Sequence, residues 1–232
     1  MKKISIIVPV RNEAAAIEDC ILSLLKYFPQ AEIIVVDGGW DETESIVLEL
    51  TKNYQNVIYI KNHNDRGKGH AIKVGIEKST GDLIAQFDSD LQFAAEDLIK
   101  LFAPLENDVA DMTLGSRFTA GAVRVDGSTP FLRTLGNSVI SLFASTITLH
   151  QITDILAGIK AWKKEVTASY NLSSDNYSYE AELPIMALKK NWRVIDVPVQ
   201  TFPRTTGVSS VGIFRTGFRL IIDMLRFRFS NG

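Results

Sequence analysis

The chain has almost no cysteine and no long apolar segment. Its 232 residues include one cysteine, Cys20, which excludes a disulfide framework and a cysteine-based metal site. Cys20 shares helical spacing with Ile17, Ile21 and Leu24, so we expect it to pack in the core. No window of 18 residues is apolar and uncharged, which predicts no membrane-spanning helix. The chain also enters a predicted strand at once, without an apolar signal segment, which favours the cytosol.

An excess of positive charge and a metal-binding histidine pattern are also missing. The formal net charge is −2 at pH 7, so no overall field attracts nucleic acid, and we expect no nucleic-acid partner. His63, His70 and His150 do not follow a ligand spacing such as HxxxH, and we expect them to be structural or exposed. No GxGxxG turn follows the first predicted strand, which argues against a dinucleotide-binding fold.

The first half alternates buried-type apolar runs with helical patterns. The predicted strands are Ile4–Val8, Ile33–Val36, Val57–Ile60, Leu83–Phe87 and Val109–Leu114. Four helices are predicted between these strands. The first runs from an Asn12 cap to Pro29, and the second has Ile46, Val47 and Leu50 on one face. The third covers Ala71–Lys78, and the fourth covers Ala95–Phe102 before Pro104. This order predicts an α/β fold with a mostly parallel central sheet flanked by helices, in a single domain.

The second half is less regular. Thr119–Pro130 is rich in glycine and small residues and predicts a mobile loop. Asn137–Leu149 is apolar at helical spacing, and Val194–Val199 predicts a strand whose Pro198 indicates a sheet edge. Gly207–Ser210 predicts a flexible turn. The chain contains no low-complexity linker, so we expect one domain over residues 1–232.

Two carboxylates one residue apart follow the fourth predicted strand. Because alternate residues of a strand point to one side, Asp88 and Asp90 are expected close together at the carboxyl end of Leu83–Phe87, where open α/β sheets bind ligands. A hard cation such as Mg²⁺ or Mn²⁺ would remove their repulsion, which predicts a metal site for a phosphorylated substrate. The alternative is a polar turn in which Asp90 caps a helix.

A series of short motifs in order resembles family 2 glycosyltransferases of the GT-A fold. The closest branch is that of dolichol-phosphate mannosyltransferase-like, or polyprenyl-phosphate sugar, transferases. The resemblance covers Ile4 to about Ser210, and each motif is weak alone. The motifs are Val8-Pro9-Val10-Arg11-Asn12-Glu13, Val35-Val36-Asp37-Gly38-Gly39, Arg66-Gly67-Lys68-Gly69, Asp88-Ser89-Asp90-Leu91-Gln92, Gly115-Ser116-Arg117, Thr153-Asp154 with Ala157-Gly158, Tyr179-Glu180, and Val197-Pro198-Val199 with Arg204, Gly207 and Ser209.

The resemblance implies a role for each of these positions. It implies a nucleotide-binding half over 1–118, an acceptor half over 119–210 and an amphipathic helix over 211–232. It implies Mg²⁺ or Mn²⁺ on Asp90, with Asp88 at the metal or the ribose, and Arg204 on the donor diphosphate. The implied donor nucleotide contacts are Pro9, Val10, Arg11, Glu13, Asp37, Arg66, Lys68, Asp88 and Ser89. The implied donor-sugar or acceptor contacts are Gln92, Arg117, Glu180 and Ser209.

The implied reaction is sugar transfer from a GDP- or UDP-sugar with inversion at the anomeric carbon. The implied acceptor is a polyprenyl phosphate; a saccharide hydroxyl in cell-surface polysaccharide synthesis is the alternative. Asp154 would be a general base for a hydroxyl, and would orient a phosphate, which is already anionic. Each of four residues also has a purely structural alternative. Asp154 could cap a helix, and Glu13 could complement the dipole at a helix start. Asp37 could form a turn, and Arg204 could be an ordinary surface residue.

Three departures from the family pattern leave the base and sugar preference open. Gly38 stands where a second Asp is common, Trp40 and Glu42 replace a small polar residue and an Asp, and Ser210 replaces a Lys. A catalytically silent binding subunit is therefore a second hypothesis, against which the intact Asp88-Ser89-Asp90 argues. Nucleotidyltransferases of similar fold are disfavoured because their Gly-rich, Arg-containing loop is absent after Val8.

The carboxyl-terminal segment combines apolar residues at helical spacing with arginines. The apolar residues are Phe214, Phe218, Ile221, Ile222, Leu225 and Phe229, and the arginines are Arg215, Arg219, Arg226 and Arg228, against Asp223. Such a helix can lie in a membrane interface, which predicts peripheral contact with the cytoplasmic face through 211–232. Packing on the domain core or in a homodimer is the alternative.

Overall fold

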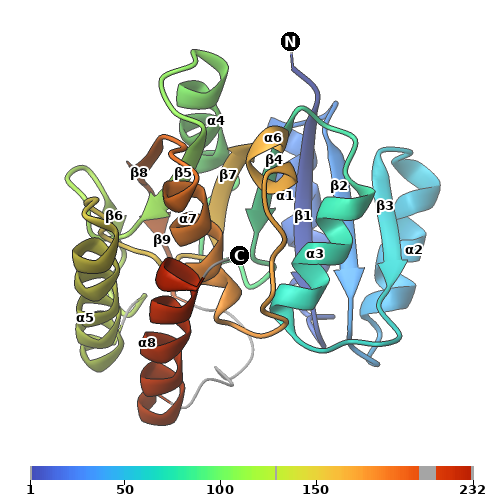
Figure 1. The fold of residues 1–232 in the computed structure, drawn as a ribbon. Helices are drawn as coiled ribbons and strands as arrows, with labels where there is room; N and C mark the ends of the chain where they lie inside the picture. Colours follow the sequence, from blue (N-terminus) through green and yellow to red (C-terminus); the bar gives the residue numbers. More distant parts are fainter. Residues whose placement is uncertain (1, 129, 204–212, 231–232) are drawn as a thin grey trace.

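The computed structural model describes residues 2–128, 130–203 and 213–230 and folds them into a sheet between two helical layers (Figure 1). The strands are β1 (Ile4–Val10), β2 (Glu32–Asp37), β3 (Val57–Lys61), β4 (Leu83–Phe87), β5 (Met112–Ser116), β6 (Val123–Arg124), β7 (Ile159–Lys163), β8 (Val194–Pro198) and β9 (Gln200–Thr201). The helices are α1 (Ile17–Tyr27), α2 (Thr43–Asn53), α3 (Lys68–Lys78), α4 (Asp97–Glu106), α5 (Phe131–Thr148), α6 (Lys164–Ala168), α7 (Tyr179–Lys189) and α8 (Ile213–Phe229).

The main sheet has the strand order β3-β2-β1-β4-β7-β5-β8. All neighbours are parallel except β7, which runs antiparallel to both β4 and β5. From β1 the chain first builds outward through β2 and β3, and then returns to place β4 on the other side of β1. The strand order therefore reverses between β1 and β4, and such a switch point opens a crevice at the carboxyl ends of the strands.

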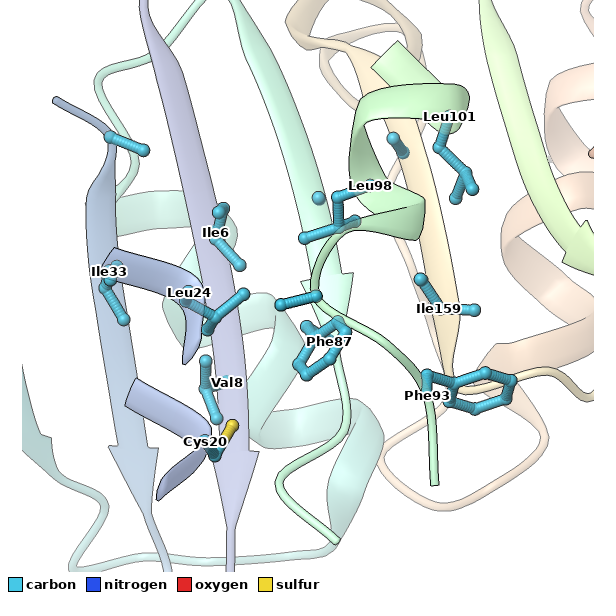
Figure 2. Close-up of a cluster of buried hydrophobic side chains, with 14 of the residues drawn as sticks. Ile6, Val8, Cys20, Leu24, Ile33, Phe87, Phe93, Leu98, Leu101 and Ile159 are labelled. Atoms are coloured by element: carbon cyan, nitrogen blue, oxygen red, sulfur yellow. The ribbon is translucent and has the colours of Figure 1, made fainter. Parts of the chain in front are cut away.

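Each face of the sheet has its own hydrophobic core. One core packs α1, α2 and α4 against the sheet, and Figure 2 shows Ile6, Cys20 and Phe87 within it. The other core packs α3, α5, α7 and α8 on the opposite face. Because helices cover both faces, the inner strands are apolar almost throughout. In β2, for example, Ile33 packs in one core and Ile34 packs in the other.

The predicted α/β class, the mostly parallel sheet and the buried Cys20 are confirmed. Pro198 closes β8, which is an edge strand as predicted. No helix in the described ranges is long and apolar enough to cross a membrane. The predicted turn at Gly207–Ser210 lies outside the described residues.

Several local predictions were wrong. Asn12 does not cap a helix: it has a φ of 57°, and α1 begins five residues later at Ile17. Pro104 does not end α4, which continues to Glu106. The predicted strand Val109–Leu114 begins only at Met112, and Lys68 rather than Ala71 opens α3. The segment Thr119–Pro130 contains β6, which pairs with β9.

Candidate active site

The two predicted metal-site carboxylates lie just beyond β4, beside the switch point. The strand ends at Phe87, and the Asp88 N–H donates to the Gly158 carbonyl at 3.1 Å. The close approach requires a glycine, because a Cβ at Gly158 would lie 1.9 Å from Asp88 Oδ2. Asp90 is buried, and its Oδ1 accepts the N–H of Gln92 at 3.2 Å. Both carboxylates thus belong to the loop that follows the strand.

Lys68 neutralises Asp88, so the pair is not left to repel as expected from the sequence. Its Nζ lies 2.6 Å from Asp88 Oδ1 and 2.8 Å from Glu180 Oε1. Burial raises the pKa of Asp88 to about 6, with Asp90 and Glu180 adding to the effect and Lys68 opposing it. Although burial alone would lower it, the pKa of Lys68 is raised by its two carboxylates. Lys68, an implied donor nucleotide contact, is thus an ion-pair partner of Asp88 in this structure.

Glu180 is held from a second side by Lys160, which sequence reasoning missed. Lys160 is fully buried; its Nζ contacts Glu180 Oε2 and donates to the Ala157 carbonyl at 2.5 Å. Gln86, the cross-strand partner of Lys160, donates to Glu180 Oε1 at 3.0 Å. Burial works against the charge of Glu180, but Lys160 and Lys68 outweigh it and lower its pKa to about 2. Glu180 is therefore an ionised, fully engaged carboxylate.

Asp37 ends β2 as predicted, but protein groups occupy both of its carboxylate oxygens. Oδ1 accepts the Gly39 N–H at 2.7 Å, and Oδ2 accepts the Tyr59 hydroxyl at 2.8 Å and the Lys61 ammonium at 3.2 Å. The residue is fully buried. In this structure Asp37 holds the β2 and β3 ends together.

The loops after β1, β2 and β3 interlock at the same edge of the sheet. Asp65 accepts the Gly67 N–H at 3.0 Å and lies 3.5 Å from Arg11 Nη1. A Cβ at Gly38 would lie 2.4 Å from the Asp65 carboxyl carbon. Asp65 thus places a carboxylate group beside Gly38, where the family pattern often has a second Asp.

The remaining predicted donor contacts are spread over this edge. Pro9 and Val10 are buried in the last two positions of β1, opposite Val36 and Asp37. The Glu13 N–H donates to Thr43 Oγ1 at 3.1 Å, which ties this loop to the start of α2. Ser89 is buried between the two carboxylates, whereas Arg66 points to Asp175, with 3.0 Å between Nε and Oδ2.

Asp154, in the predicted acceptor half, forms a further ion pair with Arg117, at the end of the predicted nucleotide-binding half. Arg117 donates from Nε to Asp154 Oδ2 at 2.6 Å and from Nη2 to Oδ1 at 2.9 Å, and its backbone N–H adds a third bond at 3.1 Å. Asp154 is fully buried. Such a two-pronged pair fixes the plane of the guanidinium. Asp154 thus orients Arg117, which lies against the rings of Phe93 and Phe118.

Asp196 on β8 supports this pair from behind. Its Oδ2 accepts both the N–H and the hydroxyl of Thr153, the residue before Asp154. The Thr153 hydroxyl also contacts Ser116 Oγ, next to Arg117, at 2.6 Å. Gln92 lies in the loop between β4 and α4, with its Nε2 3.5 Å from the Ser128 carbonyl oxygen. Arg204 and Ser209 lie outside the described residues.

The residues at the switch point suit a divalent cation shared with a ligand. In the described ranges, no three His, Cys, Asp or Glu side chains lie close enough together to hold a metal ion. These ranges therefore contain no site in which such side chains alone would surround the ion. Mg²⁺ is usually bound through one or two carboxylates together with substrate phosphates. Asp90, with Asp88 beside it, supplies hard oxygen donors of that number and kind.

The sequence of this chain matches one protein family model and is similar to several named relatives. A family model described as "Glycosyl transferase family 2" matches residues 5–165. The UDP-N-acetylglucosamine–dolichyl-phosphate N-acetylglucosaminyltransferase of Methanococcus voltae is 26% identical over 97% of this chain and 95% of that protein. The polyprenol monophosphomannose synthase of Mycolicibacterium smegmatis is 26% identical over 89% of this chain and 80% of its own length. The dodecaprenyl-phosphate galacturonate synthase of Rhizobium johnstonii is 25% identical over 98% and 67%.

Solved structures agree on the fold. Glucosyl-3-phosphoglycerate synthase from Mycobacterium tuberculosis, crystallised with Mn²⁺ and UDP-glucose, superposes with a TM-score of 0.75 at 20% identity. The match covers 98% of this chain and 79% of that one. At this identity the likeness speaks for the fold alone, which is that of the GT-A glycosyltransferases.

Proposed function

Because this chain belongs to glycosyl transferase family 2, we propose that it transfers a sugar from a nucleoside diphosphate sugar to a polyprenyl phosphate, with inversion at the anomeric carbon. The observation that carries this proposal is the pair Asp88 and Asp90 at the β1/β4 switch point, where α/β sheets bind phosphorylated ligands. The names of the three relatives described above each contain a dolichyl or other polyprenyl group linked to phosphate.

The donor's diphosphate is assigned to the edge formed by Asp90, Asp88 and Lys68. Mg²⁺ or Mn²⁺ held at Asp90, when bound, would supply Lewis-acid neutralisation of the departing diphosphate. Lys68 is a largely buried cation beside Asp88, and it adds positive charge where negative charge develops. Arg204 keeps its predicted role on the diphosphate. As the anomeric carbon–oxygen bond breaks, its electron pair leaves with the nucleoside diphosphate.

The engagement of Asp154 favours a phosphate acceptor over a hydroxyl acceptor. A hydroxyl needs a base to take its proton, but both oxygens of Asp154 already accept from Arg117. A phosphate oxygen is anionic and attacks the anomeric carbon without a base. We therefore assign Asp154 to orienting Arg117, and Arg117 to the acceptor phosphate.

Two neighbouring helices provide a surface for the lipid-bearing acceptor. Helices α5 and α8 pack against each other (Figure 1). The large apolar side chains exposed along them are Leu135, Val139 and Leu142 on α5, Leu149 after it, and Phe218, Ile222, Leu225 and Phe229 on α8. Arg219 and Arg226 of α8 are also exposed. Apolar side chains bordered by arginines suit the surface of an anionic bilayer, so we propose peripheral contact with the cytoplasmic face of a membrane.

A transfer assay tests the proposal. Purified protein is incubated with UDP-N-acetylglucosamine, UDP-glucose or GDP-mannose, Mg²⁺ or Mn²⁺, and a short polyprenyl phosphate or a saccharide. We expect one donor to give a glycosyl phosphopolyprenol of inverted anomeric configuration, read by mass spectrometry and NMR. Transfer to the saccharide alone would assign the hydroxyl-acceptor reaction, and no transfer from any donor would favour a silent homologue.

A further inference from the structure

Trp40 is the most exposed of the three tryptophans. Its side chain is 74% exposed, whereas Trp162 is fully buried and Trp192 is half-buried. It stands three residues after Asp37, at the carboxyl end of β2. An indole is large and mostly apolar, so its exposure forgoes the free energy of burial. An exposed tryptophan at the ligand-binding edge of a sheet is therefore a candidate contact.

Both the backbone and the indole of Trp40 have neighbours in the loop after β1. The backbone N–H of Trp40 donates to Asn12 Oδ1 at 2.9 Å. Gly39 packs so closely that a Cβ there would lie 2.5 Å from the Asn12 nitrogen. The Arg11 guanidinium carbon lies 5.3 Å from the centre of a Trp40 ring, in cation–π contact. Arg11 in turn lies 3.5 Å from Asp65, so two flat groups from two loops form one platform.

The carboxylate at this end of β2 is already used by the protein. Asp37 is fully buried and accepts from Gly39, Tyr59 and Lys61. A nucleobase at this edge therefore meets the flat faces of Trp40 and Arg11 instead of that carboxylate.

The platform lies at a suitable distance from the phosphate end of the site. In the sheet, β2 is next to β1 and β1 is next to β4, so the ends of β2 and β4 are two strand spacings apart, about 10 Å. A nucleotide whose diphosphate lies at Asp90 can extend across the end of β1 and place its base at Trp40.

We propose that Trp40, backed by Arg11, is the stacking platform for the base of the donor nucleotide. This inference rests on the proposed transferase function and deepens it. Stacking on an aromatic ring tolerates any base, because every base has a π-face. Trp40 therefore contributes affinity, and the choice between uracil and guanine belongs to other contacts.

Calorimetry and tryptophan fluorescence test this inference with UDP and GDP in Mg²⁺. Trp40→Ala is expected to weaken whichever nucleotide the unaltered protein binds by roughly 5- to 150-fold, the equivalent of about 1–3 kcal/mol per stacked base. Trp40→Phe keeps a ring and should stay within a few-fold of the unaltered protein. Val109→Ala, at an exposed position beyond α4, is the control. Nucleotide should quench the emission of the unaltered protein, and Trp40→Phe should lose that quenching.

Each outcome separates the inference from the function beneath it. If UDP or GDP binds the unaltered protein and Trp40→Ala equally well, and emission does not change, the stacking platform is wrong and the transferase function stands. A protein partner on Trp40 would produce that result. If neither nucleotide binds the unaltered protein, both the inference and the proposed function fail.

Discussion

Lys160 and Glu180 form a buried ion pair between the centre of the sheet and the first turn of α7. Lys160 lies on β7, next to β4, the strand that leads to Asp88. Glu180 also forms an ion pair with Lys68. Two cations and two carboxylates thus form a chain that ends at the proposed donor site: Lys160, Glu180, Lys68 and Asp88. The position of Lys68 therefore depends, through Glu180, on Lys160, which needs no contact with a ligand.

Lys160→Met should destabilise the protein by about 3 kcal/mol, because removing one partner of a buried pair leaves the other charge poorly compensated. The double variant Lys160→Met with Glu180→Gln removes both charges and should recover a good part of that loss. Urea unfolding measures both free energies. Equal losses in the single and double variants would contradict a direct Lys160–Glu180 interaction.

Stability should fall with acid because Glu180 is ionised in the folded state. Its pKa is lowered to about 2 from an ordinary value of 4.5, with Lys160 and Lys68 outweighing burial. A group with a lowered folded-state pKa stabilises fully above its unfolded value and loses that contribution as pH falls through the folded value. The loss attributable to Glu180 should therefore develop between about pH 4.5 and 2.

Urea unfolding from pH 7 down to pH 3 checks this window. Glu180→Gln is the matched variant, since it cannot titrate, and its free energy of unfolding should decline less steeply below pH 4.5. Identical slopes for the two proteins would show that Glu180 does not have the lowered pKa.

Asp154→Asn should reduce transfer without removing a titrating base. We expect a higher acceptor KM because Arg117 loses its charged partner, with a pH–rate profile of unchanged shape. Arg117→Ala combined with Asp154→Asn should cost little more than Arg117→Ala alone, because both changes disable one unit. Loss of the alkaline plateau in Asp154→Asn, with KM unchanged, would instead identify Asp154 as a general base.

The α5 and α8 surface should bind anionic membranes. Phe218 and Leu142 are 70% and 69% exposed, and we expect the protein to float with phosphatidylglycerol-rich vesicles more than with neutral ones. Phe218→Ser with Leu142→Ser should reduce flotation several-fold. Ile99→Ser with Val109→Ser changes two exposed apolar residues elsewhere and should not. Equal flotation of both double variants, or none by the unaltered protein, would contradict this surface.

The parallel half of the sheet was predictable from sequence because its strands are short apolar runs separated by helical patterns. The antiparallel strand β7 was not. The sequence of β7 places Lys160 between Ile159 and Ala161. A lysine at this position suggests a solvent-exposed side chain, so the sequence does not indicate a strand that is buried on both faces. The contacts of Lys160 with Glu180, 20 residues away, and with the Ala157 carbonyl explain why a charge is tolerated there.

Strand ends located the site residues, but their partners came from distant segments. Asp37 was correctly placed at the end of β2, yet its availability to a ligand depends on Tyr59 and Lys61, 22 and 24 residues further on. Asp154 likewise pairs with Arg117 across 37 residues. Spacing within one element carries no information about such pairs.

The most direct test is calorimetric titration of UDP and GDP into the protein with Mn²⁺ and after its removal by EDTA. Our account predicts that one nucleotide binds with Mn²⁺, binds far more weakly without it, and loses this metal dependence in Asp90→Asn. Binding that is equally strong with EDTA and in Asp90→Asn, or no binding of either nucleotide, would contradict a metal-assisted donor site at the end of β4.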